Sequence, residues 1–279
     1  MASQYVSASL LGRILLFSAI FTSIEAVLFG QLSTTIIGFS FIAGISLALV
    51  LGLTFIKLPF KLGVRIGMAW LALFIIQYFS NLFEAYFFTT LFPTVLLFLA
   101  GILESLAITF IEALLVGILF VPRDIERSYM SEIKGYFAQR SRLSWTLRVI
   151  VASLIYFPIY LVFGGLVSPF VIPYYTDPSM GLMIPSFDVM TPVELIRGFL
   201  YVLALLPIIA GIRIKRRYLY VGIASLLYVL GAFMPLLTNL SWPVQLRVFH
   251  GLEILGDCLV YGAALACLFS SQRRTGAVL

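Results

Sequence analysis

Six carboxylates lie within long apolar runs of the chain, and they are the residues with the clearest potential for chemistry. They are Glu25, Glu84, Glu104, Glu112, Glu253 and Asp257. A bare charge at the centre of a membrane helix costs roughly 2.5–3.5 kcal/mol on insertion scales. We therefore expect each of these acids to face the interior of a helix bundle, where it is paired, hydrated or protonated.

Their spacing predicts shared polar faces. Polar side chains recur at helical intervals in the first run, in the third run and in the last run, where four polar residues fall within about 120° of the helical wheel. Another two are spaced as a helix pair at the start of the sixth run. We predict one polar cavity, in the outer half of the bundle, lined by the first, third, sixth and eighth runs. The candidate substrate- or ion-binding residues are Glu25, Gln77, Asn81, Glu84, Glu194, Arg197, Arg247, His250, Glu253 and Asp257.

Basic partners for these acids are scarce. Near the outer half of the bundle the sequence offers only Arg197, Arg247 and, when protonated, His250. The acids of the first, third and fourth runs are then expected to lack a basic partner, so a bound proton or cation is the available compensation. The alternative is a neutral carboxylic acid that hydrogen-bonds to a neighbouring helix as packing.

Four functions could use such residues. A metal could be bound by His250, Glu253 and Asp257, but the chain has a single histidine, and no metal site is predicted. An intramembrane enzyme acting on a lipid or other apolar substrate could use His250 as a base, although no known catalytic motif accompanies it. A carrier could use Pro158 and Pro207 to free backbone carbonyls for ligands.

The fourth is a non-catalytic component of a membrane assembly. The leading hypothesis is a proton- or cation-linked carrier for a small molecule or ion, and the sequence identifies no cofactor.

The composition predicts that the chain is an all-α integral membrane protein, whose helices position these residues. Hydrophobic residues make up 62% of the 279 residues, charged residues make up 11%, and the mean hydropathy is +1.10. The apolar runs are continuous rather than alternating, which favours helices over a barrel. About eight transmembrane helices are expected, over residues 12–31, 36–56, 66–90, 94–121, 147–168, 192–212, 218–237 and 247–270.

The positions of the basic residues predict the orientation. Sixteen of the eighteen Lys and Arg residues fall in connectors on one side, and only Arg197 and Arg247 fall on the other. The positive-inside rule then places both termini in the cytoplasm, in a multi-pass protein of the cell membrane. The net charge of +6 is thus explained by orientation, so the predicted partner is the lipid bilayer and not nucleic acid. The first run carries Glu25 and no cleavage pattern, so it is expected to be a retained span.

The chain divides into two predicted membrane halves, residues 1–121 and 147–279. Between them, 122–146 is expected to form a cytoplasmic amphipathic helix at the membrane interface, either a linker or a docking site for a partner. Residues 169–191 hold four prolines and are predicted to form an external loop, which either caps a cavity or is a plain surface loop. Similar stretches that begin at Arg13 and Arg148 suggest a four-plus-four parallel repeat.

Overall fold

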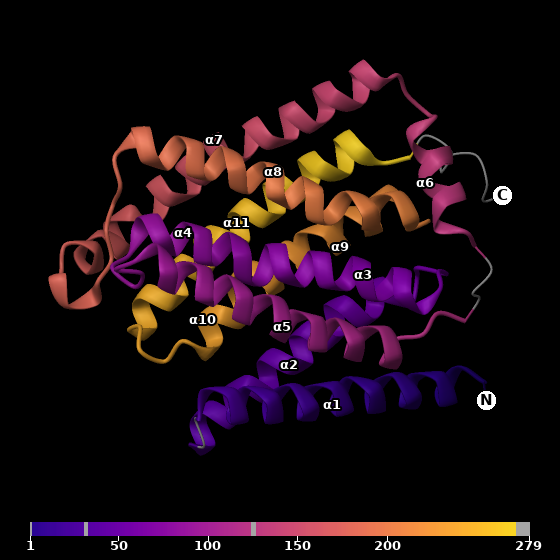
Figure 1. Cartoon of the computed structure of the whole chain (residues 1–279), viewed down its shortest axis with the longest axis horizontal. Helices are drawn as coiled ribbons and strands as arrows, with labels where there is room; N and C mark the ends of the chain where they lie inside the picture. Colours follow the sequence, from indigo (N-terminus) through magenta and orange to yellow (C-terminus); the bar gives the residue numbers. More distant parts are fainter. Residues whose placement is uncertain (1, 31–32, 124–126, 272–279) are drawn as a thin grey trace.

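The computed structural model describes residues 2–30, 33–123 and 127–271 of the chain. Within these ranges all regular elements are helices, and the only β-type pairing is one isolated bridge between Thr89 and Leu182. Eight helical segments are long and apolar enough to cross a membrane, which confirms the predicted helical bundle and its number of spans for the described residues (Figure 1). By their length and composition, these eight helices indicate a polytopic membrane protein.

The spans coincide with the apolar runs of the sequence, but two of them are interrupted. The third span joins α3, η1 and α4, and the seventh joins α9, η3 and α10. The elements are α1 (Ala2–Phe29), α2 (Thr34–Phe55), α3 (Leu62–Ala72), η1 (Leu73–Phe79), α4 (Ser80–Phe88), α5 (Val95–Leu119), α6 (Tyr129–Phe137), α7 (Arg142–Tyr175), η2 (Pro178–Met180), α8 (Phe187–Gly211), α9 (Arg216–Tyr228), η3 (Val229–Phe233), α10 (Met234–Thr238) and α11 (Val244–Phe269).

The two interruptions, η1 and η3, are π-helical turns that pack against each other. The amide of Ser80 donates to Ile75, five residues earlier, so the turn is wider than in an α-helix. Asn81 bridges the two segments, because its amide donates to the carbonyls of Gln77 and Gly231 at 2.9 and 3.0 Å. Such wide turns are frequent at functional sites.

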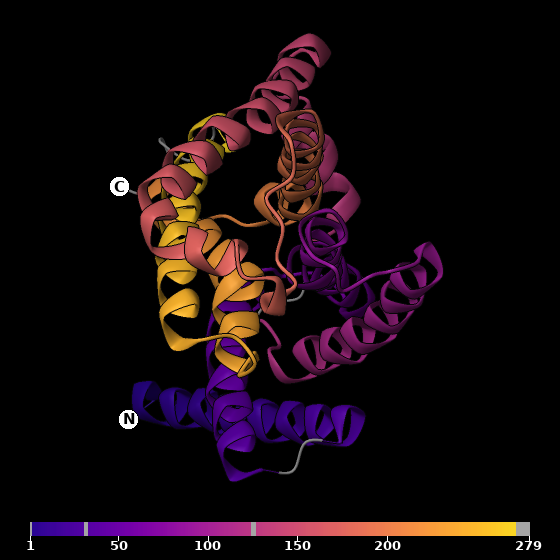
Figure 2. The same ribbon diagram turned by 90° about the vertical axis from the view of Figure 1, so that its left-hand side faces the viewer.

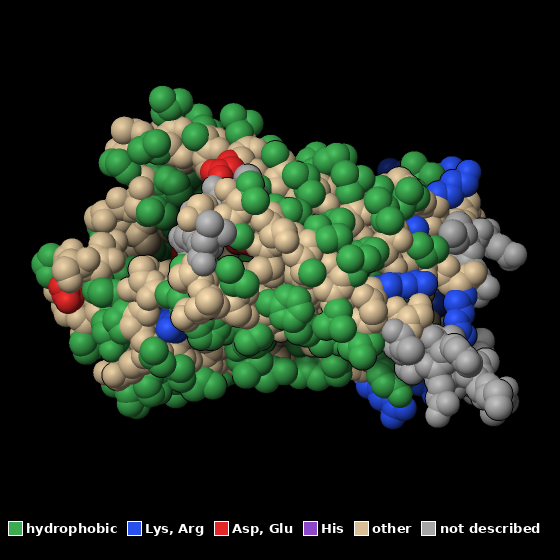
Figure 3. Space-filling model, turned by 90° about the horizontal axis from the view of Figure 1, so that it is seen from below, with side chains coloured by type: hydrophobic (Ala, Val, Ile, Leu, Met, Phe, Trp, Pro, Cys, Tyr) green, Lys and Arg blue, Asp and Glu red, His purple; other side chains and the backbone are tan. Residues whose placement is uncertain are grey.

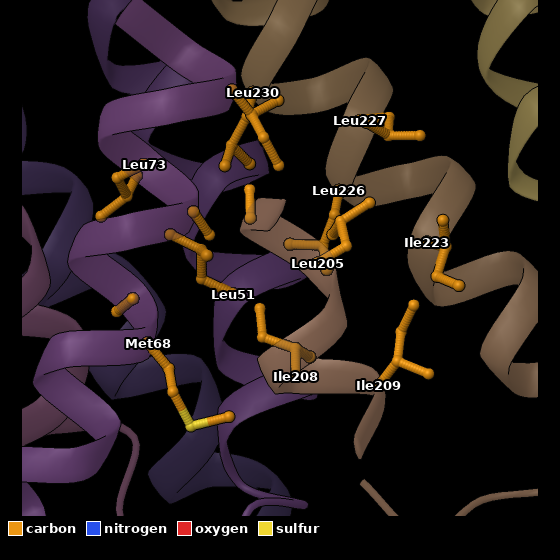
Figure 4. Packing of buried hydrophobic residues seen from close by; sticks show 14 of the residues in the cluster. Leu51, Met68, Leu73, Leu205, Ile208, Ile209, Ile223, Leu226, Leu227 and Leu230 are labelled. Carbon is orange, nitrogen blue, oxygen red and sulfur yellow. The ribbon is translucent and has the colours of Figure 1, made fainter. Parts of the chain in front are cut away.

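A single large apolar core holds the spans together. Figure 4 shows part of it, where side chains from α2, α3, η1, α8, α9 and η3 meet. The labelled side chains are Leu51, Met68, Leu73, Leu205, Ile208, Ile209, Ile223, Leu226, Leu227 and Leu230, all of them buried. In contrast, α1 lies at the edge of the bundle and packs mainly on α2 (Figure 2). Among the eight spans, α8 is the most buried, so it lies at the centre of the bundle.

Lys and Arg side chains gather at one end of the molecule (Figure 3), which we call the basic end. Connector 56–61, α6 and connector 212–215 lie there, as does the C-terminal end of α11. Three side chains of the α6–α7 region donate to the last carbonyls of α11: Tyr136 to Phe269, Arg140 to Ser270, and Arg148 to Leu268. These bonds satisfy groups that a helix end leaves unpaired and complement its dipole.

The predicted loop 169–191 is wrong at both ends, because α7 continues to Tyr175 and α8 begins at Phe187. Pro169 lacks the amide hydrogen that would bond to the carbonyl of Gly165, and the Ser168 hydroxyl donates to that carbonyl instead, at 2.8 Å. The proline is thus accommodated within the helix. Of the predicted linker 122–146, residues 124–126 lie outside the described residues, and α6 occupies 129–137.

The real connector, residues 176–186, lies at the opposite end, which we call the open end. It attaches to the end of α4 through bonds from the Thr90 amide to the Gly181 carbonyl and from the Met183 amide to the Phe88 carbonyl. Gly181 has φ +62°, and a Cβ there would lie 2.7 Å from the Thr90 hydroxyl, so glycine is required at this contact. Outside the spans, hydrogen bonds from Ser179 lower the pKa of Asp177 and order the same turn.

Candidate functional site

A cavity of about 750 Å³ lies at the open end of the bundle. This volume is within the range of small-molecule sites, roughly 300–1,000 Å³. Residues of α1, α2, η1, α4, η3, α10 and α11 form its walls, and connectors after α4, α7 and α10 form its rim. Its main polar wall residues are Thr22, Glu25, Gln77, Asn81, Glu84 and His250. The wall therefore unites polar residues from three separate spans.

One side of the cavity leads to a charged group that we call the arginine cluster: Glu84, Glu194, Arg197 and Tyr201. Arg197 donates to both oxygens of Glu194, at 3.0 and 2.9 Å, and to the Tyr201 hydroxyl at 3.2 Å. The nitrogen that donates to Tyr201 also lies 2.9 Å from Glu84. The Arg197 side chain is 6% exposed and Glu194 is fully buried, whereas the Glu84 side chain is 20% exposed on the cavity wall. One buried cation thus serves two carboxylates.

Close helix packing places Arg197. A Cβ added to the next residue, Gly198, would lie 2.5 Å from the Ser153 carbonyl of α7, so only glycine allows α7 and α8 to approach this closely. The Tyr261 hydroxyl of α11 donates to the Gly198 carbonyl at 2.9 Å. The guanidinium also lies 5.8 Å from the ring centroid of Tyr156, within cation–π range. Three helices therefore fix the position of this charge.

A second group, which we call the acid cluster, comprises Glu25, Gln77 and Glu112. Glu25 and Gln77 line the cavity, and Glu112 of α5 is fully buried and contacts the amide nitrogen of Gln77 at 3.5 Å. Glu25 Oε1, Gln77 Oε1 and Glu112 Oε2 are buried without a hydrogen-bond partner. In the part of the chain that the structure describes, no salt bridge reaches Glu25 or Glu112. This cluster therefore has acceptors and no cation.

The polar face of α11 is only partly engaged. His250 lines the cavity, and its Nδ1 lies 2.8 Å from Glu253 Oε2. Asp257 is buried deeper, and its Oδ1 has no hydrogen-bond partner. Arg247 points towards the Leu236 carbonyl, 3.5 Å away, and forms no salt bridge among the described residues. The four side chains share a helix face, as the sequence indicated, but they do not share one site.

The predicted cavity needs three corrections, two to the spans that line it and one to the pairing of its charges. The sixth span does not line it, because Glu194 and Arg197 are buried behind Glu84. The second and seventh spans do line it, through Ile36, Ile37 and Ser40 of α2 and through η3 and α10, and none of these elements carries a charged residue. Glu84 was expected to lack a basic partner, but Arg197 supplies one. Tyr201 was missed, although it lies one helical turn from Arg197 and that spacing could have identified it.

Glu104 contradicts the expectation that all six acids face inward. It is exposed on α5, whereas Glu112 on the same helix is buried. The two residues are about 80° apart on the helical wheel, so a helix packed only on one side can bury one and expose the other. Because α5 packs mainly on α3 and η1, its outer face remains uncovered.

The metal alternative receives no structural support. Among the described residues no group of three or more His, Cys, Asp and Glu side chains is arranged to hold a metal ion. His250 and Glu253 pair with each other, and Asp257 has no hydrogen bond to either.

Comparison with known proteins assigns no family to the chain. No family pattern matches it, and no curated protein and no solved structure is significantly similar. The functional argument therefore depends on the cavity and its two clusters.

Proposed function

We propose that the protein is a carrier that moves a small solute across the membrane and links this movement to protons or another cation. The observation that carries the proposal is the acid cluster, whose Glu25 and Gln77 reach a cavity open at one end of the bundle. A buried carboxylate without a basic partner needs a proton or a bound cation, and a cavity supplies access to either. A site that exchanges these two states is what a coupled carrier requires.

The proposed orientation places the basic end in the cytoplasm of a cell-membrane protein. The gathering of Lys and Arg at that end supports it through the positive-inside rule (Figure 3). The cavity then opens to the outside. The predicted parallel repeat of two four-helix halves belongs to the same proposal, since related halves are common in carriers.

The two clusters have different proposed roles. In the arginine cluster the charges are mutually compensated and held by three helices, so it anchors the wall on the α8 side. The acid cluster lies between α1, η1 and α5, and α1 lies at the edge of the bundle and packs mainly on α2. We infer that protonation and substrate binding are coupled on this less constrained side.

Proton movement in liposomes tests the proposal. The purified protein is reconstituted with a trapped pH-sensitive dye, and an interior-negative potential is applied with potassium and valinomycin. We expect faster acidification than in protein-free liposomes, or faster uptake of radioactive sodium if sodium is the coupled ion. Glu25→Gln and Glu112→Gln should reduce this flux to the protein-free rate, because the amide cannot exchange a proton.

Glu104→Gln is the matched control, because it makes the same change on the same helix as Glu112, at an exposed position outside the cavity. It should leave the flux unchanged. Proton and sodium fluxes that both equal those of protein-free liposomes would contradict the proposal. So would a flux that neither acid-cluster substitution reduces.

The second candidate is an intramembrane enzyme that acts on a lipid or other apolar substrate. The contact between His250 and Glu253 favours it, because a carboxylate that orients a histidine on a cavity wall is a common general-base arrangement. Conversion of a membrane lipid by the wild type but not by His250→Gln, detected by mass spectrometry, would support this candidate. A third candidate, a non-catalytic component of a membrane assembly, predicts neither flux nor turnover, and a stably co-purifying partner.

A further inference from the structure

We propose that the cavity binds amphipathic organic cations, the class of substituted amines and quaternary ammonium or phosphonium ions, with Glu25 as their counter-charge. This inference names the substrate class of the proposed carrier and rests on that function for its physiological meaning. The binding site itself can be tested without transport.

The sign of the charge on the cavity wall is the first argument. Glu25 and Glu84 lie on the wall, and no Lys or Arg is among the described residues that line it. Arg197 lies behind Glu84 and is already engaged by two carboxylates. The uncompensated charge therefore belongs to Glu25, with Glu112 buried nearby. A positively charged ligand would neutralise this side of the cavity, and an anion would be repelled.

An unused acceptor on the cavity wall is the second and independent argument. Gln77 is 3% exposed and lines the cavity, yet its Oε1 has no hydrogen-bond partner. A buried acceptor left unsatisfied costs about 1–3 kcal/mol. A ligand that carries an N–H donor, or a cation that the carbonyl oxygen can approach, would relieve this. Like the acids, this acceptor favours a ligand that carries a positive charge or a hydrogen-bond donor.

The remaining wall suits the organic part of such a ligand. Aromatic side chains of Tyr78, Phe88, Tyr175 and Trp242 line the cavity, and much of the wall between them is aliphatic. Aromatic rings attract organic cations through their faces, and this contribution increases where water is excluded. The volume of about 750 Å³ accommodates a molecule far larger than a metal ion or a simple ammonium ion.

A proton and an organic cation would compete for Glu25. Binding of the cation requires the ionised carboxylate, so the carboxylic proton leaves as the cation enters and returns when the cation departs. The titratable groups that face this position are Glu112 of α5 and Tyr78 of η1, with Glu84 and His250 along the cavity wall. Since none of them is permanently cationic, binding should strengthen as the pH rises. Such competition would make the carrier exchange protons for its substrate.

Equilibrium dialysis with two nearly isosteric probes tests the inference. The full chain in detergent micelles is dialysed against tetraphenylphosphonium or tetraphenylborate, with protein-free micelles as the blank. We expect saturable binding of the phosphonium at alkaline pH, weaker binding at acid pH, and no saturable binding of the borate. Glu25→Gln should weaken phosphonium binding by about tenfold to a hundredfold, and Glu104→Gln should leave it unchanged.

Borate binding as tight as phosphonium binding would overturn the inference, and so would an equal affinity of Glu25→Gln and the wild type. If Glu25→Gln does not fold, the pH dependence and the comparison of the two probes in the wild type carry the test. Failure of this inference is distinct from failure of the carrier. Without phosphonium binding, a proton flux that depends on Glu25 would still support the carrier, whereas Glu25-dependent binding without flux would remove the carrier and leave the site.

Discussion

The arginine cluster and the acid cluster both reach one cavity and compensate their buried acids in different ways. In the first, Arg197 compensates Glu84 and Glu194 and lies 2.9 Å from an oxygen of each, the length of a charge-assisted bond. In the second, Glu25, Gln77 and Glu112 leave three buried oxygens without a partner. The comparison shows how buried acids in one bundle can differ. Acids next to an arginine are used in a stabilising ion pair, whereas acids without a basic neighbour remain available for a proton or a ligand.

Removal of the shared cation is the substitution with the largest expected effect. Arg197→Met would leave Glu84 and Glu194 facing each other without compensation, and loss of one partner of a buried ion pair costs about 3–5 kcal/mol. The measurement is unfolding by sodium dodecyl sulfate in mixed micelles. Arg247→Met is the control, because Arg247 makes only one long hydrogen bond within the described part of the chain, and it should cost less than about 1 kcal/mol. Equal effects of the two substitutions would mean that the arginine cluster does not stabilise the fold.

The same substitution in both clusters gives the sharpest comparison. Glu194→Gln removes a carboxylate whose two oxygens both accept hydrogen bonds from Arg197. Hydrogen bonds to charged groups are worth about 1.5–3 kcal/mol, so the free energy of unfolding should fall by about this amount. Glu112→Gln removes a charge that has no counter-ion, so the free energy of unfolding should change by less than about 1 kcal/mol or increase. The same unfolding titration checks both. A larger loss for Glu112→Gln than for Glu194→Gln would invert the assignment of the two clusters.

A smaller effect is expected at the residue between the clusters. Asn81→Ala removes two hydrogen bonds, to the carbonyls of Gln77 and Gly231, and should destabilise the protein by about 1–2 kcal/mol. Because these bonds join η1 to η3, the substitution should also increase deuterium exchange in both π-helical segments, measured by mass spectrometry. Unchanged exchange in η3 would show that the bridge does not hold the two π-helical segments together.

Much of the fold follows from the sequence, because hydrophobic length and the positions of Lys and Arg depend on local composition. The spans were therefore found, but their ends were not. Pro169 suggested a helix end, yet the hydroxyl of Ser168 satisfies the carbonyl that the proline leaves free. That compensation depends on side-chain geometry, which a rule about proline does not include.

Only part of the cavity lining was predictable from the sequence, and the pairing of its charges was not. Helical spacing identified Glu25, Gln77 and Glu84 as facing one cavity, and they do. Which acid would obtain Arg197 depends on the packing of α7 and α8 at Gly198, a contact between helices that a single sequence does not reveal. For the same reason the sequence could not separate exposed Glu104 from buried Glu112.

The central claim is that Glu25 and Glu112 bind and release a proton within the bundle. Infrared difference spectroscopy of the reconstituted protein between acid and alkaline pH measures this directly, because a protonated carboxyl group has its own carbonyl band. We predict a band that disappears at alkaline pH, that is diminished in Glu25→Gln and in Glu112→Gln, and that is retained in Glu194→Gln. A spectrum without such a band, or one that changes only in Glu194→Gln, would contradict the claim.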